Sequence, residues 1–258
     1  MTELATTVMA LDVAVRLECV GSAAGRLERD IARAWSRCLA PSSTAADLTL
    51  TLELDLDGPE VQDDELGRAM EAVTQQVTIE AVTRRAGELL MLHACALADP
   101  ATGRCVLFVG PSGMGKSTIA WTLGRDFGYV TDETAAVTAD GRLVAYPKPL
   151  SIRAGGPAKE QHSPDDLNLV NPGDDLSVAA VLLLDRQPEQ PFAVERLPTV
   201  EGVALLAEHT SFLGELDAPL QRLAALCEDA GGLRRASYRD AAELKPLVAR
   251  LLATGSEG

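Results

Sequence analysis

The sequence predicts an α/β protein with a large C-terminal domain and a small N-terminal α/β element. Three observations lead to this prediction. Segments with the two-residue alternation of β-strands are interspersed with segments of helical spacing. A glycine-rich loop follows a short apolar strand and precedes a helix near the middle of the chain. The chain has 258 residues, 47% of them hydrophobic, which is enough for one large domain with a smaller one attached.

The N-terminal element, residues 1–88, is predicted to contain two strands and two helices. Apolar and polar residues alternate in both strands, as expected where one face is buried and the other is wet. The second strand ends at Asp57-Gly58-Pro59, a combination that breaks regular structure. The predicted elements are, in order, a strand at 11–19, a helix at 25–39, a strand at 48–56 and a helix at 64–85.

The main domain, residues 89–258, is predicted to combine short strands with helices. Residues 153–176 are rich in Gly, Pro, Asp and Asn, which predicts a long mobile loop. The other predicted elements are strands at 89–97, 104–109, 129–131, 135–138, 143–146, 178–184 and 233–238, and helices at 117–126, 199–209, 216–229 and 240–253.

The charge of the chain argues against nucleic acid and membranes as partners. There are 23 Lys and Arg against 38 Asp and Glu, a net charge of -15, so a polyanion or an anionic bilayer would be repelled. Aromatic residues make up only 3% of the chain, too few for a base-stacking platform. A small anion can still bind locally to backbone amides.

Cysteine usage and the N-terminal sequence predict a cytoplasmic protein. The five cysteines are odd in number and no two have C-x-x-C spacing, which favours reduced thiols over disulfides or a zinc site. The first residues carry acids and lack the basic region of a signal peptide. The longest apolar run, residues 178–184, is far too short to cross a bilayer.

The strongest motif is GPSGMGKST at residues 110–118, which matches G-x-x-x-x-G-K-[ST] between a strand and a helix. Its glycines permit backbone angles that turn successive N–H groups inward toward a phosphate. Lys116 is expected to reach the β and γ phosphates, and Ser117 to supply a hydroxyl to Mg²⁺. The residues expected to contact a nucleotide are Gly110, Ser112, Gly113, Met114, Gly115, Lys116, Ser117 and Thr118.

Three further polar positions lie near predicted strand ends. Asp132 and Glu133 begin 16 residues after Lys116, and are read either as a catalytic pair or as a solvated strand end. His93 lies in an apolar strand and is either a core residue or part of the site. Asp185 follows the apolar run 178–184, where an acid can hold Mg²⁺ or simply begin a turn.

The order of these features resembles the HPr serine kinase/phosphorylase family and its relatives, which share a phosphate-loop core with phosphoenolpyruvate carboxykinase. The features are Leu92-His93-Ala94, the glycine loop at 110–118, and Tyr129-Val130-Thr131-Asp132-Glu133. The resemblance covers about residues 89–149. The continuation at 146–150, YPKPL, also resembles small relatives encoded beside peptide-modifying genes, some of which phosphorylate serine of a ribosomal peptide. The second acid is Glu133 where the bifunctional enzymes have Asp.

The resemblance implies a P-loop core of the HPr-kinase or carboxykinase type and a role for each site residue. Asp132 would be the general base, and Glu133 would hold Mg²⁺ or orient the base. Ser117 and Asp132 would also be candidate ligands of the metal ion. His93 would lie near the transferred phosphate. Arg153, just beyond the core, is the best candidate for a clamp on phosphate oxygens.

These expectations combine into one functional hypothesis. The chain would use ATP and Mg²⁺ to phosphorylate a hydroxyl, with serine of a peptide or protein ahead of a small-molecule alcohol. A nucleotide-binding regulatory or partner protein without transferase activity is the alternative, and an ATPase that drives assembly is a third. Members of the resembled family often form rings, so a homo-oligomer is compatible with the resemblance. The sequence does not name the acceptor.

Overall fold

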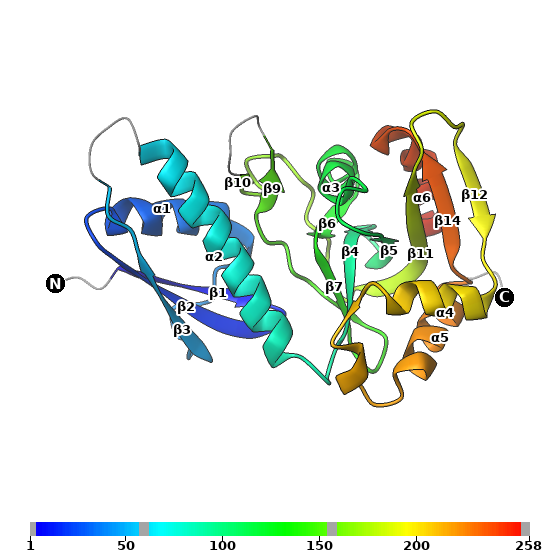
Figure 1. Ribbon diagram of the computed structural model, residues 1–258, viewed down its shortest axis with the longest axis horizontal. Coiled ribbons are helices and arrows are strands. Elements are labelled where there is room, and N and C mark those ends of the chain that lie inside the picture. Colours follow the sequence, from blue (N-terminus) through cyan, green and yellow to red (C-terminus); the bar gives the residue numbers. More distant parts are fainter. Residues whose placement is uncertain (1–3, 57–61, 154–158, 254–258) are drawn as a thin grey trace. The chain divides into compact units, whose positions relative to one another are not determined.

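The computed structural model describes residues 4–56, 62–153 and 159–253 of a mixed α/β protein (Figure 1). The chain divides into two compact units. The first unit comprises residues 1–84 and 146–168, and the second comprises residues 85–145 and 169–258. The observed division after Arg84 lies four residues before the predicted boundary at 88. Residues 146–168, which the sequence analysis assigned to the main domain, return to the first unit.

The first unit contains a three-stranded sheet in the order β1-β2-β3 and two long helices. Strand β2 pairs antiparallel with β1 and parallel with β3. A short antiparallel pair, β9 and β10, is formed by the returning segment. The elements are β1 (Ala5–Ala10), β2 (Val13–Val20), α1 (Ala24–Ala34), the 3-10 helix η1 (Ser36–Cys38), β3 (Leu48–Glu53), α2 (Gln62–Arg84), β9 (Leu150–Ile152) and β10 (Glu160–His162).

Strand β1 was not predicted, and the predicted strand start at Leu11 was wrong. Leu11 and Asp12 form the two-residue turn between β1 and β2, with φ of 51° and 62°. A turn with two positive φ values is usually marked by Asn-Gly or Asp-Gly, and this one is not. The alternation that begins at Leu11 therefore concealed a hairpin.

Aromatic and hydroxyl groups hold the returning segment within the first unit. The ring centroids of Trp35 and Tyr146 are 6.3 Å apart, and both side chains are fully buried. The hydroxyl groups of Thr78 and Tyr146 are hydrogen-bonded at 2.8 Å. Residues about 70 positions apart in the sequence thus share one core, which no local pattern could indicate.

The second unit is built on a nine-stranded mixed sheet formed by its described residues. Its main path is β12-β14-β11-β5-β4-β7-β8, and β6 and β13 each pair with β4 beside that path. Strands β5, β11 and β14 are parallel, and the remaining pairings are antiparallel. The strands are β4 (Leu90–Ala98), β5 (Arg104–Val109), β6 (Gly128–Thr131), β7 (Thr134–Val137), β8 (Leu143–Val144), β11 (Ser177–Arg186), β12 (Ala193–Arg196), β13 (Thr210–Ser211) and β14 (Arg234–Tyr238).

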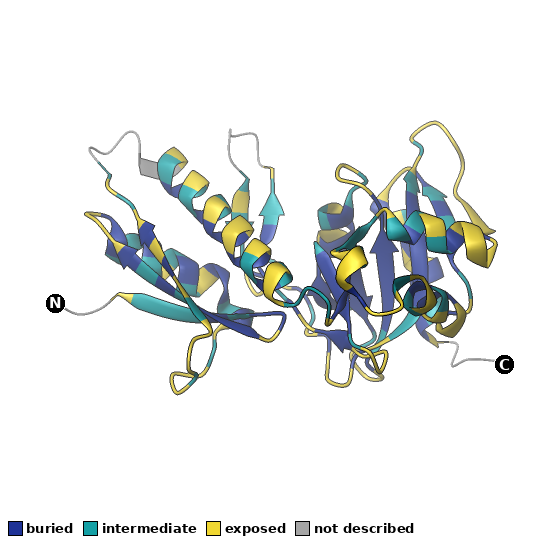
Figure 2. Ribbon diagram, turned by 60° about the horizontal axis from the view of Figure 1, so that its bottom comes forward, coloured by how far each residue is buried: buried dark blue, intermediate teal, exposed yellow. Residues whose placement is uncertain are grey.

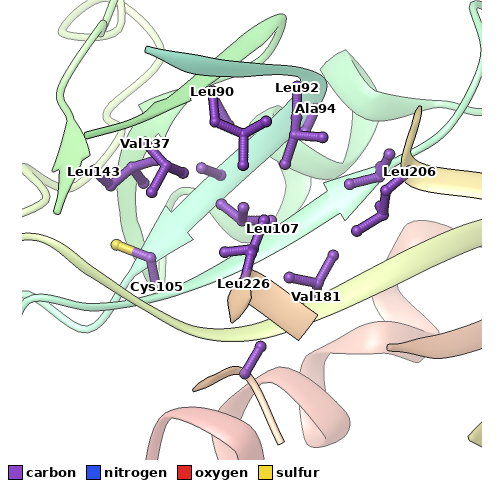
Figure 3. Packing of buried hydrophobic residues seen from close by; sticks show 14 of the residues in the cluster. Leu90, Leu92, Ala94, Cys105, Leu107, Val137, Leu143, Val181, Leu206 and Leu226 are labelled. Carbon is purple, nitrogen blue, oxygen red and sulfur yellow. The ribbon is translucent and has the colours of Figure 1, made fainter. Parts of the chain in front are cut away.

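Helices cover both faces of this sheet. Leu206, Leu223 and Leu226, from α4 (Thr199–Ala207) and α5 (Pro219–Asp229), pack in one buried cluster with Leu107 and Val181 (Figure 3). The second helical layer consists of α3 (Lys116–Leu123) and α6 (Lys245–Ala253), which pack on β4, β5 and β11. The central strands are consequently almost entirely buried (Figure 2). Two 3-10 helices, η2 (Leu213–Glu215) and η3 (Ala241–Leu244), connect these helices and strands.

The prediction of one long loop at residues 153–176 is wrong at β10 (Glu160–His162), whereas residues 163–176 contain no helix and no strand other than an isolated bridge at Val170. Residues 154–158 lie outside the described residues. Beyond them, β10 pairs with β9, and the Arg37 guanidinium contacts Asp165 at 2.7 Å. In the second unit, the Val170 amide donates to the Gly124 carbonyl at 2.7 Å. The polar composition of this segment thus reflects turns and surface contacts.

The sequence also predicts reduced cysteines and no segment long enough to cross a membrane. All five cysteines lie among the described residues and are buried free thiols. In the described ranges, no helix has the length and apolar character needed to span a bilayer.

Candidate functional site

The glycine-rich loop lies where β5 leaves the sheet and α3 begins. Gly113 and Gly115 have φ of 90° and 89°, a region that L-residues with side chains rarely adopt. A Cβ atom on Gly113 would meet nothing within 4 Å, so the loop is open to solvent at this point. A Cβ atom on Gly110 would lie 3.3 Å from Cβ of Leu184. Glycine therefore serves both the turn and the close approach of the loop to β11.

The loop presents backbone and short side chains around the start of a helix. Ser112 and Gly113 are exposed, Met114 is half-buried, and Thr118 is exposed on the first turn of α3. The first N–H groups of a helix have no partner within the helix and carry the positive end of its dipole. Backbone donors at a helix start after an open glycine loop can bind an anion.

Lys116 is folded back against the loop. Its side chain is buried, and Nζ donates hydrogen bonds to the carbonyl oxygens of Gly110 at 2.5 Å and Pro111 at 3.0 Å. Burial lowers the pKa of Lys116 to about 8, while Cys95, Asp132 and Glu133 act in the opposite direction. An ammonium group in this position is poised to exchange two carbonyl oxygens for anionic ones.

A hydroxyl–carboxylate cluster lies beside the lysine. The Ser117 hydroxyl donates to Oδ2 of Asp132 at 2.7 Å, and the Tyr129 hydroxyl donates to Oδ1 at 3.2 Å. Asp132 is only 4% exposed. A buried carboxylate needs such partners, because an unpaired charge away from water is costly. The fold thus brings Ser117 and Asp132 into contact across 15 positions of sequence.

The position of the acidic pair follows from how the sheet is interrupted. Strands β6 and β7 both pair antiparallel with β4, and Asp132 and Glu133 form the break between them. The register along β4 shifts inside β6, where Ala96 pairs with Thr131 but Leu97 with Tyr129, just before the break. Across the break the register is kept, and the Ala94 amide donates to the Glu133 carbonyl at 3.0 Å. Irregular strand pairing of this kind redirects side chains and is common at functional sites. Here it accompanies the contact of Asp132 with α3.

His93 lies on β4 directly beside the acidic pair. Its imidazole is half-buried and interacts with the Glu133 backbone. Burial lowers the pKa of His93, and the nearby charge of Lys116 lowers it further, while Glu133 raises it. The pairing of Ala94 with Val109 places His93 next to Gly110, where the loop begins. The structure therefore brings His93 to the loop, the lysine and the acids.

Two residues at the end of β14, Ser237 and Tyr238, were missed by the sequence analysis. The Tyr238 hydroxyl donates to the carbonyl oxygen of Met114 in the loop, and burial raises the pKa of Tyr238 to about 12. Its neighbour Ser237 donates to Oδ2 of Asp185 at 2.9 Å, and Gln187 Nε2 donates to Oδ1 at 2.8 Å. Asp185 thus lies at the same end of the sheet. The parallel pairing of β14 with β11 brings Tyr238 to the end of the sheet where the loop lies, and the sequence does not reveal which strands pair.

Two further expectations concern Arg153 as a phosphate clamp and the residues that would hold a metal ion. Arg153 is exposed and belongs to the first unit, whereas the loop belongs to the second. Among the residues that the structure describes, no cluster of three or more His, Cys, Asp or Glu side chains could hold a metal ion alone. The oxygens offered near the loop are those of Ser117, Asp132 and Glu133.

The candidate site in the second unit therefore consists of the glycine loop, Lys116, the Ser117–Asp132 contact, Glu133 and His93. Neither a protein-family model nor a curated protein sequence matches the chain.

Proposed function

We propose that the second unit has a P-loop fold of the HPr-kinase or carboxykinase type and transfers the γ-phosphoryl group of ATP to a hydroxyl. The observation that carries this proposal is the 2.7 Å contact between Ser117 and Asp132. A structural turn of glycines has no need of a buried carboxylate beside it. A phosphate-binding loop that uses a metal ion and a base does need one.

The nucleotide phosphates would bind over the loop. Backbone N–H groups at the loop and the start of α3 would receive their oxygens, and Lys116 would replace its bonds to Gly110 and Pro111 with bonds to the β and γ phosphates. The α3 helix begins at Lys116, so the lysine and the first free amides point to the same region. The open space at Gly113 favours access by such a ligand.

The oxygens near the loop fit Mg²⁺. This ion prefers hard oxygen ligands and usually takes one or two from the protein, completing its shell with water and phosphate. Ser117 and Asp132 or Glu133 would hold it, and it would neutralise charge on the phosphates. The lack of a metal cage among the described residues is the arrangement expected for a metal that arrives with its nucleotide.

In the proposed transfer, the acceptor oxygen forms a bond to the γ phosphorus as the bond to the β–γ bridging oxygen breaks. ADP leaves with the electrons of that bond, and the acceptor proton passes to a carboxylate. Asp132 is the proposed proton acceptor. Because both of its oxygens already accept hydroxyl hydrogen bonds, a role mainly in holding the metal is the specific alternative for Asp132.

The proposed acceptor is a serine of a peptide or protein, and a small-molecule alcohol is the second candidate. A nucleotide-binding partner protein without transferase activity would keep the loop but has no use for the acids. An assembly ATPase would hydrolyse ATP at the same rate with and without an acceptor. Measuring ADP release with no acceptor, with serine-containing peptides and with small alcohols separates these possibilities.

The first experiment tests the nucleotide site. Replacing Lys116 with Met removes the ammonium group that contacts Gly110 and Pro111 in the loop. Hydrogen bonds to charged groups contribute about 1.5–3 kcal/mol, so the affinity for a non-hydrolysable ATP analogue with Mg²⁺ should fall by about tenfold or more. Isothermal titration calorimetry measures this affinity.

The matched control is Lys245→Met, which removes an exposed lysine of the same unit that pairs with Asp126. This variant should bind the analogue as the parent does. If the parent itself does not bind the analogue, the proposed function is wrong, whatever the variants do.

A further inference from the structure

A second histidine lies beside the site, at a place where one strand takes over from another. Strand β5 occupies one side of β4 until Val109 pairs with Ala94, and the chain then leaves the sheet as the glycine loop. Along the same strand β4, β13 pairs with Leu92 and Met91. Strand β13 thus pairs with β4 beyond the point where β5 leaves the sheet. His209, the residue immediately before β13, therefore lies next to the loop.

The register makes His209 the cross-strand partner of His93. Thr210 pairs with Leu92 in an antiparallel arrangement, so the preceding residue, His209, stands opposite His93. The His93 amide donates to the His209 carbonyl at 2.7 Å, which confirms that the pairing extends to this position. Residues directly opposite in an antiparallel pair project from the same face, with Cβ atoms about 4.5–5.5 Å apart. The two imidazoles therefore share one face of the sheet.

That face is the one on which Lys116 and Asp132 lie. Leu92 and Ala94 belong to the apolar cluster under α4 and α5 (Figure 3). His93 stands between them in the strand, so it projects to the opposite face, where α3 packs. His209 interacts electrostatically with both His93 and Lys116. Burial and the charge of Lys116 lower the pKa of His209, while Glu208 raises it. Both imidazoles are thus favoured in the neutral form, which carries one N–H donor each.

From this geometry we infer that His209 is a further residue of the same site and contacts the phosphoryl group that is transferred. The inference rests on the proposed function. Lys116 would contact the β and γ oxygens, and His93 lies beside Glu133. The imidazole of His209 is the next potential donor, on the chain segment that leads into β13. A neutral N–H at this point can donate to a γ-phosphoryl oxygen without adding a second positive charge beside Lys116.

The strained backbone after β13 supports a functional role for this segment. Phe212, the residue after β13, has φ of 52° and ψ of 33°, a left-handed conformation that is uncommon for a bulky residue. It is also 39% exposed. Residues held in such conformations cluster at functional sites, where the surrounding structure maintains them. The strain is three residues from His209, on the element that the pairing places beside the loop.

The test compares two nucleotides that differ only in the group His209 is inferred to touch. The affinities of MgADP and of the Mg²⁺ complex of a β,γ-imido ATP analogue are measured for the parent and for His209→Asn. We expect the variant to bind the analogue about tenfold more weakly, the usual scale of a lost hydrogen bond to a charged group, with MgADP affinity changed by less than about twofold. His209→Gln, whose longer side chain can carry its amide N–H farther toward the phosphoryl group than that of Asn, should recover part of the loss.

Each outcome separates this inference from the proposed function. If the parent binds neither nucleotide, the proposed function fails. If the parent binds both and His209→Asn leaves their affinity ratio unchanged, only the role of His209 is wrong. An equal loss for both nucleotides would likewise overturn it, because His209 would then act only on the shape of the loop.

Two controls protect the test against misfolding. His162→Asn removes a histidine of the first unit that pairs with Glu160, and it should bind both nucleotides as the parent does. The parent itself offers a second measurement, because the chain has only three histidines. Their imidazole proton resonances, with that of His162 assigned from its variant, should show two signals that shift more with the ATP analogue than with ADP. Equal shifts with both nucleotides would overturn the inference without any His209 variant.

Discussion

The two units each contain an aspartate that accepts a hydrogen bond from a serine, but the two carboxylates are in opposite environments. In the first unit, Asp165 accepts from the Ser36 hydroxyl at 2.5 Å and from Arg37 at 2.7 Å, and its side chain is 53% exposed. In the second unit, Asp132 accepts from two hydroxyls and is 4% exposed. Asp165 joins η1 to the returning segment, whereas Asp132 joins the glycine loop to an interrupted strand.

The difference between the two aspartates indicates which cluster has a function beyond folding. The Asp165 carboxylate is 53% exposed and stays partly solvated, and its Arg37 partner, 10% exposed, supplies an opposing charge, so the presence of this pair needs no further explanation. Asp132 is buried and held by two neutral hydroxyls, with the Lys116 ammonium acting on it electrostatically, and taking such a carboxylate out of water costs far more than leaving one at the surface. Folds keep such local conflicts mainly at functional sites. Substitutions at the two positions should therefore have opposite consequences for activity and stability.

The largest expected effect is that of Asp132→Asn on phosphoryl transfer. The amide keeps the size of the carboxylate, and the Ser117 and Tyr129 hydroxyls can reorient to match it, so the fold should be retained. Transfer should fall by about 10²–10⁴-fold, the scale of a lost general base, with nucleotide affinity little changed. Single-turnover kinetics with radiolabelled ATP and a serine-containing acceptor measure this rate.

The paired variant Glu133→Gln should weaken the dependence on Mg²⁺ concentration more than it slows the chemical step. If Asp132→Asn instead loses nucleotide or Mg²⁺ affinity first, Asp132 is mainly a metal ligand. If Asp132→Asn transferred phosphate at the full rate to an acceptor that the parent phosphorylates, both proposed roles of Asp132 would be wrong. The contrast between Asp132 and Asp165 would then have no functional meaning.

An intermediate effect is expected at Tyr238, which touches the loop but not the acids. Tyr238→Phe preserves the buried ring and removes the hydroxyl that holds the Met114 carbonyl. A neutral hydrogen bond contributes about 0.5–1.5 kcal/mol, so the affinity for the ATP analogue and that for ADP should both fall by about two- to tenfold. Titration with each nucleotide measures this. Thermal unfolding of the variant should be close to that of the parent, and a loss of stability with unchanged affinity would show that the bond serves folding alone.

The smallest effect is expected from Asp165→Asn, on the stability of the first unit. Because the carboxylate of this pair is 53% exposed, loss of its charge should lower the free energy of unfolding by about 1 kcal/mol at most. The Ser36 hydroxyl lowers the pKa of Asp165 below its ordinary 3.8, and Arg37 acts in the same direction. A lowered pKa means that the contribution is present above the ordinary value and is lost as the pH falls through the folded value.

Urea unfolding of this variant and its parent should therefore differ at neutral pH and converge in acid. The measurement can follow Trp35, which is buried in the first unit, if Trp121 is first replaced by Phe in both proteins. Nucleotide binding should be the same in both. A change in nucleotide affinity would mean that the first unit takes part in the site, contrary to the comparison.

Local patterns predicted most of the regular elements and the chemistry of the loop. Strand 104–109 has the predicted bounds, and α2 and α5 lie within three residues of theirs, because apolar periodicity and breakers act over short distances. The short strands β1, β9, β10, β12 and β13 were missed. A strand such as β13, Thr210–Ser211, is too short to show a period, and it exists because β4 offers unpaired backbone groups where β5 departs.

By itself, the sequence determined the mixed α/β class, the loop at residues 110–118 and the candidacy of Asp132, Glu133 and His93, because each depends on residue type and close spacing. Only the tertiary structure decided that residues 146–168 return to the first unit, that Ser117 meets Asp132, and that Tyr238 and His209 lie beside the loop. These results depend on strand order, register and the break between β6 and β7. Such features arise when distant segments satisfy one another's backbone hydrogen bonds and bury shared apolar surface, and no short stretch of the chain encodes them.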